Sequence, residues 1–137
     1  MTPRITAAVA LLIVLCGCDN RVPPFHDFTG VSRVHVMGLG GRDTLRTLLA
    51  PDSIAALLRF VNARNSDWGQ PWSGVPVPKV TAYFFGADFQ GSFGAGPDFF
   101  ETQRAGTFAS RVATSSELAE FARLVGVPRE RVRAEHR

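Results

Sequence analysis

Short segments with a two-residue repeat, separated by turn residues, fill the chain from residue 80 to residue 112. They are Val80–Phe85, a segment from Phe89 to Phe93, a shorter fragment at Phe99–Thr102, and Thr107–Val112. Such alternation over a short run predicts a β-strand, and the turn residues between the runs predict antiparallel neighbours. Gly91 and Gly94 predict a bulge or the close approach of another backbone. This stretch therefore predicts an antiparallel meander.

A second pair of strands is expected nearer the N-terminus. Val31–Met37 alternates β-branched and polar residues, and Thr44–Leu49 follows after a glycine-rich break at Gly38–Gly41. A glycine-rich run could also cradle a phosphate, but that requires a strand-to-helix context with a specific spacing. Here a strand is predicted on both sides, so we interpret the break as a hairpin turn.

Two amphipathic helices are predicted. In Pro51–Arg64 the apolar side chains recur at helical spacing, at Ile54, Leu57, Leu58 and Val61. The second helix begins after Thr114-Ser115-Ser116-Glu117, which matches a capping box, and ends at Gly126 with Pro128 beyond it. Its apolar face is formed by Leu118, Phe121, Ala122 and Val125. Residues 129–135 could add a short terminal helix.

These elements predict an α+β fold in the order ββα-loop-βββα. We expect a small antiparallel sheet of about five strands, with the two helices covering one of its faces. The chain has 137 residues, and residues 29–137 would form a single domain.

The predicted loop between the two halves, residues 65–78, contains both tryptophans, Trp68 and Trp72. Long irregular loops inside compact domains are uncommon and are often functional. Tryptophan is enriched at interface hot spots, so both are candidate partner-binding residues. The alternative is structural: the same rings could fold back and close the edge of the sheet.

The N-terminus has the pattern of an export signal. Arg4 precedes an apolar run, Ala7–Leu15, that is too short to span a bilayer as a helix. Leu15-Cys16-Gly17-Cys18 then resembles the lipobox of bacterial lipoproteins. The resemblance covers four residues and implies cleavage before Cys18, which would carry the lipid. Residues 1–17 would be the signal peptide and residues 18–28 a tether; an ordinary signal peptide cut elsewhere is the alternative.

Lipidation of Cys18 would leave no cysteine for other chemistry. Cys16 would be removed with the signal peptide, so neither a disulfide nor a reactive thiol is expected. The net charge of the whole chain is only +3, with interleaved signs, which argues against nucleic acid as a partner.

Catalytic groups are sparse. His26, His35 and His136 are scattered along the chain, without the spacing of a metal site or a nucleophilic triad. Asp98 and Glu101 could act as an acid–base pair, but a turn aspartate and a solvated strand glutamate are the simpler interpretation. We therefore expect no cofactor, no metal and no catalytic residue.

The sequence thus favours a lipoprotein of the bacterial cell envelope, facing the periplasm or the exterior, that acts as a non-catalytic binding or accessory module. Its expected partners are the membrane, through the lipid anchor, and another envelope protein or the cell wall. An envelope enzyme with an unrecognised site and a purely structural component are the alternatives. Asp19 resembles an inner-membrane retention signal, but inner and outer membrane both stay open, as does the oligomeric state.

Overall fold

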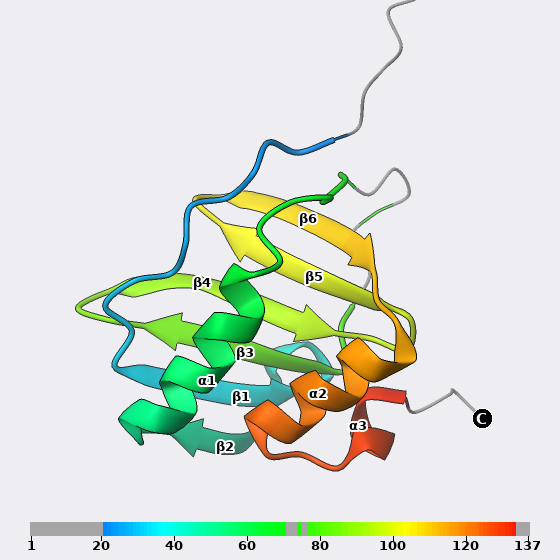
Figure 1. Cartoon of the computed structure of the whole chain (residues 1–137). Helices are drawn as coiled ribbons and strands as arrows, with labels where there is room; N and C mark the ends of the chain where they lie inside the picture. The colour runs from blue at the N-terminus through cyan, green and yellow to red at the C-terminus, as the bar shows by residue number, and fades with distance from the viewer. Residues whose placement is uncertain (1–20, 71–73, 75–76, 134–137) are drawn as a thin grey trace, which may run out of the picture.

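One antiparallel sheet of six strands forms the centre of the fold, with helices packed on one face (Figure 1). The computed structural model describes residues 21–70, 74 and 77–133. The strand order across the sheet is β2-β1-β3-β4-β5-β6. The strands are β1 (Arg33–Gly38), β2 (Asp43–Leu48), β3 (Val80–Phe85), β4 (Phe89–Ala95), β5 (Phe99–Arg104) and β6 (Thr107–Val112). The helices are α1 (Pro51–Asn62), α2 (Ser115–Val125) and α3 (Arg129–Arg133), and a 3-10 turn, η1 (Leu39–Gly41), joins β1 to β2.

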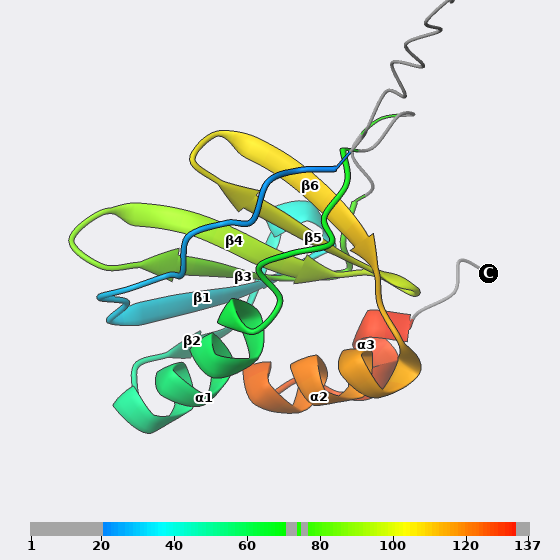
Figure 2. The same ribbon diagram turned by 45° about the horizontal axis from the view of Figure 1, so that its top comes forward.

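Figures 1 and 2 show α1 and α2 on the same side of the sheet. We call the opposite side the outer face. The predicted α+β class and the order of the first elements are confirmed. The sheet has six strands where about five were predicted, because the fragment predicted at residues 99–102 is a full strand that continues to Arg104. The third helix, α3, lies within residues 129–135, where the sequence allowed a short terminal helix.

The capping signals at α2 are confirmed. The Thr114 hydroxyl accepts a hydrogen bond from the Glu117 backbone N–H at 3.2 Å, and the Glu117 carboxylate accepts one from the Thr114 N–H at 2.9 Å. Gly126 ends the helix in the left-handed conformation, with φ +73°. In α1 the buried face includes Phe60, while Leu58 is only half-buried.

An aromatic cluster between the helices and the sheet explains the position of Phe60. Its ring meets those of Phe93, Phe100 and Phe121 at centroid distances of 6.2, 5.9 and 6.3 Å. All four rings are buried and come from α1, β4, β5 and α2. This cluster therefore packs α1 and α2 against β4 and β5.

The lack of a side chain at Gly91 allows the close approach of a neighbouring backbone that the sequence predicted. Its φ is +151°, and a Cβ added there would lie 2.3 Å from the Gln103 carbonyl oxygen. The register between β3 and β4 shifts next to it, where Phe84 pairs with Gly91 but Phe85 pairs with Phe89. A side chain at residue 91 would thus collide with β5.

Residues 21–28, which fall within the tether predicted over residues 18–28, pack against the domain, while residues 18–20 lie outside the described residues. The Val22 N–H donates to the Trp68 carbonyl at 2.8 Å, and the Phe25 N–H donates to the Asn65 carbonyl at 2.9 Å. Phe28 is buried, and the Asn62 side-chain amide pairs with both its N–H and its carbonyl. Aromatic side chains and backbone pairing thus hold residues 21–28, which we call the N-terminal strap.

The predicted signal peptide and Cys18 lie outside the described residues. No helix in the described part of the chain is both long and apolar enough to cross a membrane.

Candidate functional site

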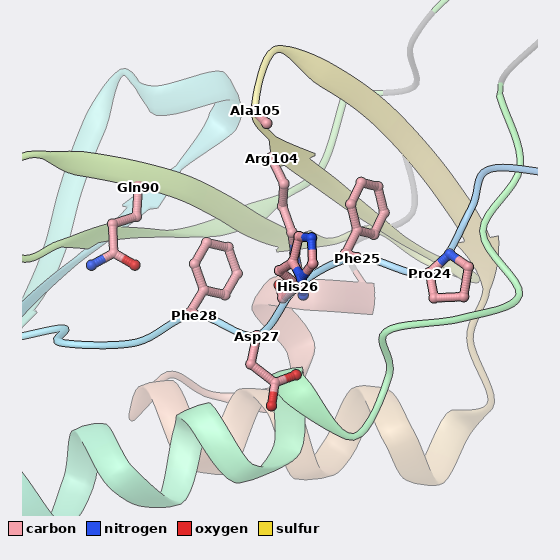
Figure 3. A pocket seen from close by; sticks show the side chains of 8 residues that line it. All are labelled: Pro24, Phe25, His26, Asp27, Phe28, Gln90, Arg104 and Ala105. Atoms are coloured by element: carbon pink, nitrogen blue, oxygen red, sulfur yellow. Dashed lines mark hydrogen bonds between the residues drawn. The ribbon is translucent and has the colours of Figure 1, made fainter.

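A pocket of about 400 Å³ lies between the N-terminal strap and the ends of β4 and β5 (Figure 3). The strap contributes five of its residues, and β4, β5 and the turn after β5 contribute one residue each. They are Pro24, Phe25, His26, Asp27, Phe28, Gln90, Arg104 and Ala105. Its volume falls within the usual range for small-molecule sites.

Among the charged residues that line the pocket, Arg104 is the most deeply buried, with 5% of its surface exposed. Its guanidinium carbon lies 4.3 Å from the centroid of the Phe28 ring and 5.1 Å from that of Phe25. Figure 3 shows the two rings on either side of its side chain. The guanidinium group is weakly hydrated and stacks well on aromatic faces. The two rings of the strap therefore partly offset the cost of removing this cation from water.

Only some of the N–H groups of the Arg104 guanidinium donate hydrogen bonds. Nη1 donates to the His26 carbonyl at 3.0 Å and Nε donates to the Thr102 hydroxyl at 3.3 Å. Nη2 is buried and has no hydrogen-bond partner among the residues that the structure describes. Burial lowers the pKa of Arg104 to about 10, against a smaller opposing effect of the Asp27 charge, so the group stays positively charged at pH 7.

The surrounding groups do not neutralise Arg104 directly. Figure 3 shows the Asp27 carboxylate pointing toward α1, away from the arginine. Gln90 uses its amide to donate to the Thr29 carbonyl at 2.6 Å. A buried guanidinium with an unpaired N–H is matched chemically by a carboxylate or another planar anion. The aromatic walls favour an anion that carries a small apolar group.

Trp68, the first candidate contact residue, is a core residue instead. Only 1% of its surface is exposed, and its ring packs edge-on against Phe93 and Phe25 at 5.8 and 6.3 Å. Its Nε1 donates to the Arg64 carbonyl at 2.6 Å. Burial of Trp68 therefore favours the structural alternative, in which the ring folds back onto the domain, over a contact with a partner. Trp72 lies outside the described residues, as does the predicted lipidation site, Cys18.

The other candidate groups are not brought together. His26 lines the pocket, whereas His35 lies on β1 with its ring 5.1 Å from that of Phe85; His136 lies outside the described residues. Across the described ranges, no cluster of three or more histidine, cysteine or acidic side chains could hold a metal ion.

Glu101 is not the solvated strand residue that we expected. It is 8% exposed, and its Oε2 has no partner in the described part of the chain. Burial raises the pKa of Glu101 to about 7. Burial of the Tyr83 hydroxyl, and to a smaller extent the charge of Glu101, raises the pKa of Tyr83. Asp98 is exposed, so the two acidic residues occupy different environments.

The sequence analysis missed Arg104. Arginine on an exposed strand is common, and no local pattern marks this one as buried. The usable signal was Phe25 and Phe28, two large apolar side chains in a segment interpreted as a tether.

Comparisons of the chain with protein-family models, with curated proteins and with solved structures gave no match.

Proposed function

We propose that this chain is a bacterial envelope lipoprotein, anchored to a membrane through Cys18, that acts as a non-catalytic binding module. The envelope location of the protein is inferred from the short apolar run and the lipobox-like Leu15-Cys16-Gly17-Cys18. Its partners would be the membrane, through the anchor, and an envelope protein or the cell wall. The lipid would be attached only a few residues before the pocket, because the N-terminal strap, which follows Cys18 in the sequence, forms one wall of the pocket.

The binding role rests on one observation, the buried Arg104 guanidinium with its unpaired Nη2 beside a pocket. This arrangement suits a ligand with a free carboxylate next to a small apolar group. The C-terminal end of a peptide has that chemistry, and both envelope proteins and cell-wall peptides present such ends. Arg104 would bind the carboxylate, and Phe25 and Phe28 would contact the apolar group.

Cys18→Ala is expected to leave an uncleaved precursor that carries no lipid. Lipoprotein processing acts at the cysteine that receives the lipid, so residues 1–17 would be retained. Cys16→Ala is the matched control and should be cleaved and lipidated as the wild type is. Intact-mass spectrometry of the membrane-extracted proteins measures both changes. Normal processing of Cys18→Ala, or a block in Cys16→Ala, would show that the lipidated residue is misassigned.

Arg104→Gln is expected to weaken carboxylate binding roughly 10- to 100-fold, since a hydrogen bond to a charged group contributes about 1.5–3 kcal/mol. The probe is N-acetyl-alanyl-alanine, compared with its C-terminal amide, and the readout is the shift of the Arg104 Nε–H resonance in the wild type and of neighbouring backbone resonances in both proteins. Arg59→Gln, an exposed change on α1, is the control. Thermal unfolding establishes that each variant is folded. Equal binding of acid and amide, or wild-type affinity in folded Arg104→Gln, would refute the assignment.

A further inference from the structure

The N-terminal strap enters the domain beside the edge strand β6. Arg21 pairs with Gly69, and Gly69 in turn pairs with Ser110 of β6. The second pairing has both backbone hydrogen bonds, at 3.0 and 2.9 Å. Figures 1 and 2 agree that the described chain begins close to β6, at the opposite edge of the sheet from β2.

This entry point lies close to any lipid carried by Cys18. Three Cα–Cα steps separate Cys18 from Arg21, and at about 3.8 Å each they span at most ~11 Å. The domain of an anchored chain therefore cannot move far from the bilayer, and the part nearest to it is the edge formed by Gly69 and β6. This step rests on the lipidation proposed above.

Two exposed apolar side chains flank Ser110 at that edge. Phe108 and Val112 are 42% and 82% exposed, while Ala109 between them is buried on the helix side of the sheet. Since side chains alternate along a strand, Phe108, Ser110 and Val112 share the outer face, and each apolar residue lies about 7 Å from Ser110. The exposed apolar pair thus lies next to the point where the anchored segment enters.

We propose that Phe108 and Val112 dock into the surface of the phospholipid bilayer that holds the Cys18 anchor. Two side chains are too few for a stable interface with a free protein, which needs about 800 Å² from each partner. Beside a covalent anchor they need little affinity of their own, because the anchor supplies a high effective concentration. The domain is then held with the outer face of β6 toward the lipid and β2, at the other edge of the sheet, farther from it.

The test uses the processed, lipidated protein, from Cys18 onward, with Val112→Cys. Cys16 leaves with the signal peptide and Cys18 is blocked by lipid, so residue 112 carries the only free thiol. It is labelled with a nitrobenzoxadiazole fluorophore in phosphatidylethanolamine–phosphatidylglycerol vesicles. Leu49→Cys is the matched control: Leu49 is also exposed, but it follows β2 at the far edge of the sheet. Nitroxide-labelled lipids should quench the label at residue 112 several-fold more than the label at residue 49.

Equal quenching at the two positions would overturn the proposal. Protection of residue 112 in native membranes but not in pure phospholipid vesicles would also overturn it, because the occupant would then be another envelope component. Intact mass separates this result from a failure of the proposed function. A protein without lipid refutes both, whereas a lipidated protein with a water-exposed residue 112 refutes only the docking surface.

Discussion

Replacing Trp68 with alanine is expected to lower the free energy of unfolding by about 3–5 kcal/mol. The indole ring is buried against Phe93 and Phe25, and its Nε1 donates to the Arg64 carbonyl at 2.6 Å. The substitution leaves a cavity as well as a carbonyl without its partner. Because Phe25 also stacks near Arg104, the loss of Trp68 should loosen the N-terminal strap and the pocket behind it.

Urea unfolding of the chain from residue 19 onward measures the effect. Phe108→Ala is the matched control, since it also truncates an aromatic side chain, but at a position exposed to solvent. It should cost less than about 1 kcal/mol, as expected for a surface position. A similarly small loss for Trp68→Ala would mean that the ring contributes little to the core and would reopen the contact interpretation.

The sequence was most informative where local chemistry alone decides the structure. Thr114 and Glu117 form the predicted capping box, and Gly126 takes the left-handed conformation that ends α2. These signals depend on neighbours a few residues away, so no tertiary information is needed to interpret them. The same holds for the strands before and after η1, where a glycine-rich turn separates two short alternating runs.

Burial could not be predicted where distant segments decide it. Phe25 and Phe28 lie in a Pro-rich polar stretch that has no period of its own, and the pairing of the strap with residues 62, 65 and 68 fixes their place. Arg104 is buried because the strap crosses it. The local sequence around each of these residues is compatible with full exposure, so the pocket emerges only from the assembled fold.

The sequence of β5 likewise does not indicate which of its two faces is buried. Phe100, Thr102 and Arg104 face the helix side, while Phe99, Glu101 and Gln103 lie on the outer face. Polar and aromatic residues occur on both sides, so two-residue alternation indicates a strand without indicating which face is buried. The interpretation of Glu101 as solvated followed from that ambiguity.

Glu101 is expected to make the stability of the domain depend on pH. Its pKa is raised by burial from 4.5 to about 7. Between these values the folded protein keeps a proton that the unfolded chain releases, so the free energy of unfolding falls as the pH rises through this window. At about 1.4 kcal/mol per pH unit, the contribution lost by pH 8 is about 3 kcal/mol.

Glu101→Gln tests this directly, because the amide has nearly the same shape but cannot ionise. Relative to the wild type, the variant should gain about 3 kcal/mol in free energy of unfolding between pH 4 and pH 8. Any cost of the buried amide itself adds equally at both pH values and cancels in this comparison. Glu130→Gln, on the exposed surface of α3, controls for the loss of one negative charge. Urea unfolding at constant ionic strength gives the difference curve, and a flat curve for Glu101→Gln would show that the carboxyl group titrates alike in the folded and unfolded chains.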